Sequence, residues 1–297
     1  LGDFMLTLPA LKALRDAYSS SQIEILGYPH IAAVADKRFY ADAVRSIEYG
    51  ALSRFFARNA EISLDLRDYF GGFDLILSYL YDPDQIFEEN LRRCGAQNIV
   101  CGPARIIPGL HAAQQLAEPL QQLGINVSDF SAKIFPSSED RELARQFLGR
   151  FDSPVLALHP GSGSEKKNWP IQNWIDLAKT FLNGSVPFPT IIFVSGEADE
   201  KEMEQLRAVF GSEPRAGFAR SLALPQLAAI LERSTFIGHD SGISHLAAAA
   251  GGPCLILFGP TDPGVWAPKN QNVRLLLSPN GNLNQLTVAT VRDAIRN

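Results

Sequence analysis

The sequence predicts an α/β protein with two doubly wound units, each built on a parallel sheet that helices cover on both faces. Short apolar runs alternate with helical stretches along the whole chain. The runs in the second half are continuous Val, Ile, Leu and Phe segments, which is typical of strands buried on both faces. A length of 297 residues with 46% hydrophobic residues allows two domains, each with a core of its own.

The first half opens on a helical pattern that runs from Phe4 to about Ser19. A doubly wound unit normally opens on a strand, so we expect a first N-terminal strand to be missing from this sequence. Later helices are expected at Ile171–Leu182, Glu200–Phe210, Leu224–Glu232 and Thr287–Asn297. The expected strands are Ile23–Leu26, Val44–Tyr49, Leu75–Tyr79, Asn98–Val100, Val155–His159, Thr190–Val194, Thr235–Gly238, Cys254–Phe258 and Val273–Leu277.

The boundary between the two units is predicted near Pro136–Asp140, a polar break that precedes an amphipathic helix. Ser138 is the expected cap of that helix. We therefore divide the chain into residues 1–136 and residues 137–297, two α/β domains in series.

Composition excludes several classes of protein. Acidic residues outnumber basic ones, with a net charge of −5, so neither half is the basic body of a nucleic-acid binder. Three cysteines without a CxxC spacing predict neither a disulfide framework nor a cysteine zinc site, and they fit a reducing cytoplasm. Cys254 lies in an apolar run and is expected in the core. No stretch approaches the 18 apolar residues of a spanning helix.

The strongest local signal is the segment Phe236–Ala247, in which an apolar strand leads into a polar turn and an alanine-rich helix. Ligands of open α/β sheets bind beyond the carboxyl ends of strands, and free N–H groups at a helix start attract anions. Ser241 can cap this helix or contact a phosphate, and His245 lies one turn further on. The alternative is that Asp240 and Ser241 are ordinary caps and that His245 is an interior histidine.

A second signal is the small-residue loop within Leu158–Pro170. The backbone N–H groups of Ser162, Gly163 and Ser164 can form a phosphate nest, to which Lys167 adds a mobile cation. The alternative is a plain glycine-rich loop with solvated lysines. The loop is neither a Walker loop nor a G-x-G-x-x-G dinucleotide motif.

Four weaker signals each have a structural alternative. Asp3 is either a helix cap or a general base at the mouth of the first domain. The acidic segment Ser195–Glu200 either binds ribose hydroxyls or caps a helix. The segment Leu52–Arg58 either packs a phenylalanine pair in the core or touches a membrane surface. The turn Phe258–Pro263 is either the rim of a cleft or simple turn chemistry.

Taken in order, these segments resemble glycosyltransferase family 9, the ADP-heptose:lipopolysaccharide heptosyltransferases and their relatives. The motifs are G-D-x-x-x-T-x-P-A-L at Gly2–Leu11, H-P-G-S…K-x-W-P at His159–Pro170, and D-S-G-x-x-H-L-A-A-A…G-P-x-x-x-L-F-G-P-T-D-P at Asp240–Pro263. Residues 27–136 match only in general layout.

The resemblance implies a GT-B fold, with two Rossmann-like domains that face each other across a cleft. The N-terminal domain would take the acceptor and the C-terminal domain the nucleotide sugar, and the terminal helix would cross back to the first domain. Asp3 matches the family's catalytic base, and Lys167 matches the lysine that neutralises the donor diphosphate. The other matching donor-binding positions are Ser162, Gly163, Glu197 or Asp199, Asp240, Ser241, Gly242 and His245.

The implied activity is metal-independent, inverting transfer of a heptose or similar sugar from ADP-heptose, or a related nucleotide sugar, to a lipopolysaccharide-core or related glycan acceptor. No cofactor beyond the nucleotide sugar and no nucleic-acid partner is implied. The alternatives are a nucleotide-sugar epimerase and a non-catalytic nucleotide- or glycan-binding GT-B relative. The implied location is the cytoplasm, and peripheral contact with the inner face of the cytoplasmic membrane stays open.

Overall fold

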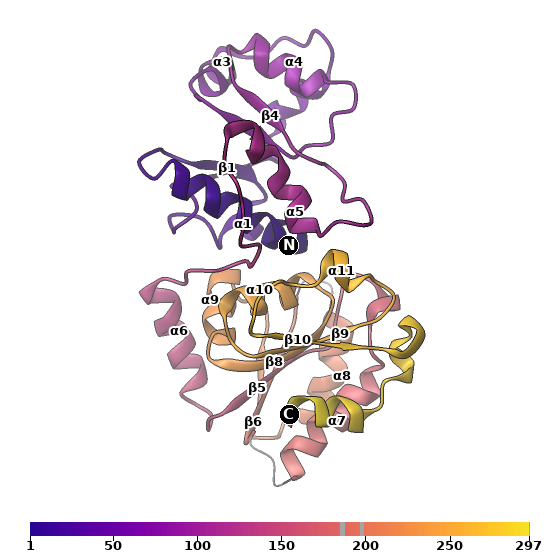
Figure 1. Ribbon diagram of the computed structural model, residues 1–297. Helices are drawn as coiled ribbons and strands as arrows, with labels where there is room; N and C mark the ends of the chain where they lie inside the picture. The colour runs from indigo at the N-terminus through magenta and orange to yellow at the C-terminus, as the bar shows by residue number, and fades with distance from the viewer. Residues whose placement is uncertain (185–187, 197–198, 297) are drawn as a thin grey trace.

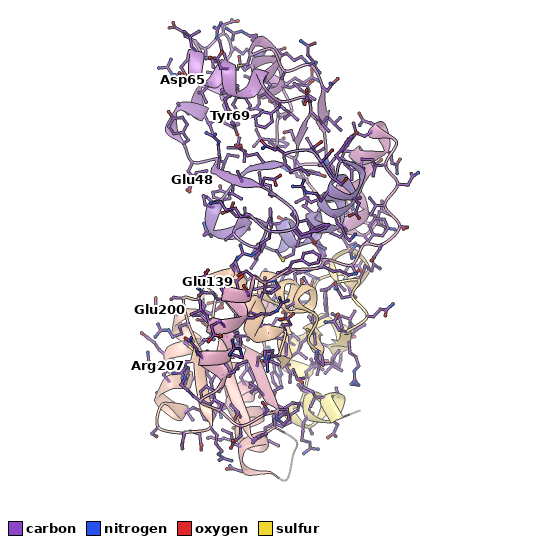
Figure 2. The ribbon with its side chains drawn as sticks, turned by 90° about the vertical axis from the view of Figure 1, so that its left-hand side faces the viewer. Glu48, Asp65, Tyr69, Glu139, Glu200 and Arg207 are labelled. Atoms are coloured by element: carbon purple, nitrogen blue, oxygen red, sulfur yellow. The ribbon has the colours of Figure 1, made fainter. Side chains whose placement is uncertain are left out.

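The computed structural model describes residues 1–184, 188–196 and 199–296, which form two α/β units (Figure 1). The upper unit in Figure 1 holds the elements from α1 to α5 and the lower unit those from α6 to α12. In the view of Figure 2, Glu48 lies above the junction between the units and Glu139 lies just below it.

The lower unit is built on a six-stranded parallel sheet with the order β10-β9-β8-β5-β6-β7. All five residues of β5, β6 and β9 are buried, as the continuous apolar runs predicted. The strands are β5 (Val155–His159), β6 (Thr190–Val194), β7 (Ala216–Ala219), β8 (Ser234–His239), β9 (Cys254–Phe258) and β10 (Val273–Leu277).

Helices cover both faces of this sheet, because successive side chains of each strand point to opposite faces. Val155 and Ala157 of β5 pack in one apolar cluster, whereas Leu156 and Leu158 pack in a second. The first cluster includes residues of α6 (Ser138–Leu148), α9 (Leu224–Leu231) and α10 (Gly242–Ala250). The second includes residues of α7 (Ile171–Asn183), α8 (Glu200–Phe210) and α12 (Val288–Arg296). A further short helix, α11, spans Pro263–Trp266.

The upper unit carries two separate parallel strand pairs, β1-β2 and β3-β4, whose residues are mostly half-buried. The strands are β1 (Glu24–Gly27), β2 (Ala43–Ser46), β3 (Ile76–Ser78) and β4 (Ile99–Cys101). The helices are α1 (Gly2–Ala17), α2 (Pro29–Ala32), α3 (Leu64–Gly71), α4 (Ile86–Arg93) and α5 (Ala112–Ala117).

Polar contacts between largely buried side chains join the two units. The Arg38 guanidinium lies 2.6 Å from the Asp140 carboxylate at the start of α6. His111, which caps α5, contacts the Ala267 carbonyl oxygen at 2.8 Å, just after α11. Trp266 of α11 packs in a cluster with upper-unit residues such as Leu6. In Figure 1, α1 and α10 lie on either side of the junction between the two units.

The structure corrects two expectations, one about the cap of α6 and one about where the terminal helix packs. Ser137, rather than Ser138, caps α6, because its hydroxyl accepts from Asp140 N while the Asp140 carboxylate accepts from Ser137 N in a capping box. The terminal helix α12 does not cross back to the first unit. Its buried Val291 packs in the same cluster as α7, which holds α12 against the lower unit.

Two core predictions have different outcomes. Cys254 is buried, as expected. The phenylalanine pair of the segment Leu52–Arg58 is split, since Phe55 is fully buried whereas Phe56 is 50% exposed. Of the helices in the described residues, none combines the length and apolar character needed to cross a membrane.

Candidate functional site

The candidate site lies where β5 and β8 end next to each other. The two strands pair in parallel, with His159 opposite Gly238, so the loops that follow them emerge side by side. These are the two segments that the sequence singled out as chemical, and their proximity requires the strand order of the lower sheet.

An ion pair connects the two loops. The Lys167 ammonium lies 2.8 Å from Asp240 Oδ2, and the Thr261 hydroxyl donates to the same oxygen at 2.7 Å. Asp240 is 7% exposed, whereas the Lys167 side chain is 30% exposed. Asp240 therefore anchors a lysine whose charge still faces solvent, and Thr261 fixes the orientation of the carboxylate.

Helix α10 begins directly after this carboxylate. Ser241 is its N-cap, and the Ser241 hydroxyl accepts from Ser244 N at 3.3 Å. The first N–H groups of a helix lack intrahelical partners and carry the positive end of the helix dipole. The predicted cap is thus present, and α10 begins two residues after Asp240, the residue that pairs with Lys167.

The N-terminus of α1 meets the N-terminus of α10. A Cβ atom added at Gly242 would lie 2.8 Å from Leu1 Cβ and 3.0 Å from Gly2 N, so only glycine permits this approach. A Cβ atom added at Gly2 would lie 3.9 Å from His245 Cδ2. Asp3 follows in the first turn of α1, where Leu1 rather than Asp3 is the N-cap, and its side chain is exposed. The structure therefore brings Asp3, from the other unit, next to the start of α10.

His245 is a buried neutral histidine of this cluster. Its Nε2 lies 4.0 Å from Asp240 Oδ1. Burial lowers the pKa of His245 well below its usual value, and the attraction of Asp240 opposes that shift only in part. At neutral pH the ring is uncharged, so it can donate or accept a hydrogen bond without adding charge.

The loop after β5 is braced from within. The Ser162 hydroxyl lies 2.7 Å from Asn168 Oδ1 and 2.9 Å from the Ser164 carbonyl oxygen. Gly163 is exposed, and a Cβ atom added there would meet nothing within 4 Å. Ser162 therefore supports the loop with its hydroxyl, while Gly163 leaves open space for a ligand.

Asp199 has a partner that the sequence did not reveal. It is 3% exposed, and its Oδ2 accepts from His159 Nε2 at 2.8 Å and from Gly196 N at 2.8 Å. Burial alone would raise the pKa of Asp199, but the His159 hydrogen bond and charge hold it below its usual value. The Asp199 carboxylate is thus occupied by hydrogen bonds to groups of the protein itself. The other residue considered for the nucleoside, Glu197, lies outside the described residues.

Sequence reasoning found most of the cluster and missed its supports. Lys167, Asp240, Ser241, Gly242 and His245 gather as expected, with Asp3 beside them. The roles that the sequence did not assign belong to Thr261, His159 and His239. Each of these residues lies within or next to a strand-end motif, which was the only signal available. In the described ranges, no group of three or more His, Cys, Asp or Glu residues could hold a metal ion.

Comparison with known proteins gives a family for this chain. The family described as glycosyltransferase family 9 (heptosyltransferase) matches residues 109–293. Lipopolysaccharide heptosyltransferase 2 of Salmonella typhimurium is 26% identical over 56% of this chain and 46% of its own length. Lipopolysaccharide heptosyltransferase 3 of Escherichia coli is 24% identical over 92% of this chain and 83% of its own length. The chain spans about half the length of the first of these curated relatives.

Solved structures show the same fold. The glycosyl transferase family 9 protein of Veillonella parvula has a TM-score of 0.79 at 20% identity, covering 99% of this chain and 93% of that one. The E. coli heptosyltransferase WaaC with ADP has a TM-score of 0.72 at 18% identity, covering 99% and 96%. The predicted GT-B fold is confirmed. The match over residues 109–293 exceeds half of the chain, and on this ground the chain belongs to glycosyltransferase family 9, the heptosyltransferases.

Proposed function

We propose that this chain is an inverting glycosyltransferase that moves heptose from ADP-heptose to a lipopolysaccharide-core acceptor. The observation that carries the proposal is the convergence of the Lys167–Asp240 pair and the starts of α10 and α1 at the junction of the units. This cluster offers positive charge on the lower unit and an exposed carboxylate, Asp3, on the upper unit. The relatives support the sugar, since their names are lipopolysaccharide heptosyltransferases.

The lower unit, residues 137–297, would bind the donor. A diphosphate carries negative charge that suits the Lys167 ammonium and the N–H groups at the start of α10. That charge grows as the bond between the anomeric carbon and the diphosphate oxygen breaks. Groups that bind the leaving diphosphate more strongly than the intact donor lower the barrier. Two structural neighbours were solved with ADP and with ADP-2-deoxy-2-fluoro heptose, which supports an adenine nucleotide here.

The upper unit, residues 1–136, would bind the acceptor. Asp3 is exposed in the first turn of α1, so an acceptor hydroxyl can reach it. Asp3 takes the hydroxyl proton while the oxygen attacks the anomeric carbon from the face opposite the diphosphate. One C–O bond forms, one C–O bond breaks, the proton rests on Asp3, and ADP leaves with the bonding electrons. The configuration at the anomeric carbon is inverted.

The test is an assay of the purified chain with ADP-heptose, with and without heptose-deficient lipopolysaccharide. Transfer predicts ADP release that depends on the acceptor and a mass gain of one heptose on that acceptor. An isomerised donor without acceptor would instead support the epimerase alternative, and nucleotide binding without turnover would support the non-catalytic alternative. Running the assay with the acceptor in vesicles and in detergent also tests whether the reaction occurs at a membrane surface.

Lys167→Ala is the sharpest variant for the donor side. We expect ADP to bind about 10–100-fold more weakly, because a charge-assisted hydrogen bond contributes roughly 1.5–3 kcal/mol. Lys166→Ala is the matched control, since Lys166 is the adjacent exposed lysine of the same loop. Equal losses in the two variants would remove Lys167 from the donor site.

A further inference from the structure

His239, the last residue of β8, has a fully buried ring, and both of its nitrogens contact the loop that follows β5. Its Nε2 accepts from Trp169 N at 2.7 Å, and its Nδ1 lies 3.4 Å from the Gly161 carbonyl oxygen. Trp174 of α7 packs edge-on against the ring, with centroids 5.2 Å apart. The ring therefore bridges the beginning and the end of one loop.

These two partners define the protonation state of His239. A backbone N–H can only donate, so Nε2 must be unprotonated, and a carbonyl oxygen can only accept, so Nδ1 must carry the proton. A second proton would place Nε2–H against the Trp169 N–H and break that bond. Burial lowers the pKa of His239 to about 3, and His159 acts in the same direction, while Asp199 and Asp240 oppose the shift. The geometry thus fits only the neutral Nδ1–H tautomer.

The loop between these two contacts carries Lys167. Trp169 is a firm anchor, since it is 1% exposed and its indole N–H donates to the Leu286 carbonyl oxygen at 2.9 Å. Lys167 precedes that anchor by two residues, and its ammonium contacts Asp240, the residue directly after His239. Two consecutive residues at the end of β8 thus hold the base of the loop and its lysine.

We propose that His239 is a positioning residue for Lys167, which acts by clamping Gly161 and Trp169 as a permanently neutral imidazole. The proposal rests on the proposed function in one respect, that Lys167 binds a nucleotide diphosphate. A neutral ring suits this place, because only an unprotonated Nε2 can accept from Trp169 N while Nδ1–H donates to the Gly161 carbonyl oxygen. A merely apolar residue of similar size would fill the space but would leave Trp169 N without a partner.

Two variants of similar size separate the two hydrogen bonds. His239→Gln keeps an acceptor near the position of Nε2, whereas His239→Asn keeps a donor near the position of Nδ1 and loses contact with Trp169. We expect ADP affinity within about threefold of the parent for His239→Gln and about 10-fold weaker for His239→Asn, the scale of one hydrogen bond that positions a charge. His30→Asn, at an exposed histidine, is the control and should change nothing.

A double-mutant cycle distinguishes positioning from general support. If His239 acts through Lys167, His239→Asn should weaken ADP binding far less in a Lys167→Ala background than in the parent. An equal loss in both backgrounds would overturn the proposal, because it would mean that the clamp supports the fold without directing the lysine.

Two further readouts do not depend on the proposed function. The chain has five histidines, so the ¹⁵N spectrum of a histidine-labelled sample should show His239 as the Nδ1–H tautomer, unchanged from pH 8 to pH 5. Hydrogen exchange of residues 160–170 should be faster in His239→Asn than in His239→Gln. A parent protein that binds no ADP but meets both expectations would contradict the proposed function and keep the clamp. A titrating His239, or equal exchange in the two variants, would overturn the clamp.

Discussion

The two units of the molecule differ in how their sheets are built, and the candidate site uses that difference. In the lower unit, six parallel strands are continuous, and β5, β6 and β9 are buried along their full length. In the upper unit, the strands form two separate pairs whose residues are mostly half-buried. The lower unit fixes charged groups with short internal hydrogen bonds, whereas the upper unit presents the exposed Asp3 carboxylate at the start of α1.

This contrast suits the two proposed substrates. A diphosphate is small and strongly charged, so its binding groups gain from being held in place before the ligand arrives. The ion pair of Lys167 with Asp240, and the bond of Thr261 to the same carboxylate, provide that preorganisation. An acceptor hydroxyl needs a base that it can reach, and the exposed Asp3 carboxylate is accessible in that way.

The largest effect is expected on the transfer rate when Asp3, the proposed base of the upper unit, is replaced. Asp3→Asn should lower the transfer rate about 10²–10⁴-fold, because the amide cannot accept the acceptor proton. ADP affinity should stay within about threefold, since the donor groups belong to the other unit. Steady-state assays and calorimetric titration with ADP measure the two quantities.

Asp16→Asn is the control for that experiment, because Asp16 is an exposed carboxylate on the same helix, where it pairs with Lys12. It should leave the transfer rate within about twofold of the parent, the range of surface substitutions. A parallel loss of ADP binding in Asp3→Asn would mean that Asp3 supports the junction between α1 and α10 instead of acting as a base.

The next largest effects are on the free energy of unfolding, and they compare a strand of the lower sheet with a strand of the upper unit. Leu158→Ala, at a fully buried position of β5, should lower the free energy of unfolding by roughly 3 kcal/mol. Leu26→Ala, on half-buried β1, should cost about 1 kcal/mol, since less apolar area leaves water there on folding. Urea unfolding followed by circular dichroism gives both values, and equal costs would show that the upper unit is packed as firmly as the lower one.

The sequence predicted the lower sheet well because its strands are long, continuous apolar runs. All five strands predicted there are present: four have the predicted bounds, and β8 is one residue longer at each end. The edge strand β7 was missed, since Ala216–Ala219 contains a single large apolar residue and a glycine. The cap of α6 was placed one residue late because Ser137 and Ser138 are both good caps and only the capping box distinguishes them.

The site was predictable as motifs but not as contacts. Asp240, Ser241 and Lys167 were found because polar residues at strand ends form ligand sites in open sheets. The pair of His159 with Asp199 depends on a contact between segments 40 residues apart in the chain. The clamp by His239 requires β5 and β8 to be neighbours, although β6 and β7 lie between them in the sequence. No local spacing carries that information.

A smaller effect concerns the ion pair that joins the units. Burial would raise the pKa of Asp140, but hydrogen bonds from Arg38 and Ser137 hold it below the usual value of 3.8. The stabilisation is therefore complete above about pH 4 and is lost as the pH falls through the lower native pKa. Asp140→Asn should cost roughly 1–2 kcal/mol at pH 7 and progressively less below about pH 4. Urea midpoints across pH 2.5–7 test this, with the exposed Asp152→Asn as control. A cost that stays constant with pH would contradict it.

The last prediction is that removal of divalent cations leaves the transfer rate nearly unchanged. If Lys167 and the N–H groups of α10 supply the positive charge that the leaving diphosphate needs, a divalent cation adds little. Transfer in excess EDTA should then stay within about twofold of the rate with magnesium. The same assay on Lys167→Ala makes the result decisive, because magnesium should restore part of the lost rate only where the lysine charge is gone. If the parent enzyme lost its activity in EDTA and regained it with magnesium, a metal ion, rather than Lys167 and the start of α10, would be the group that neutralises the leaving diphosphate.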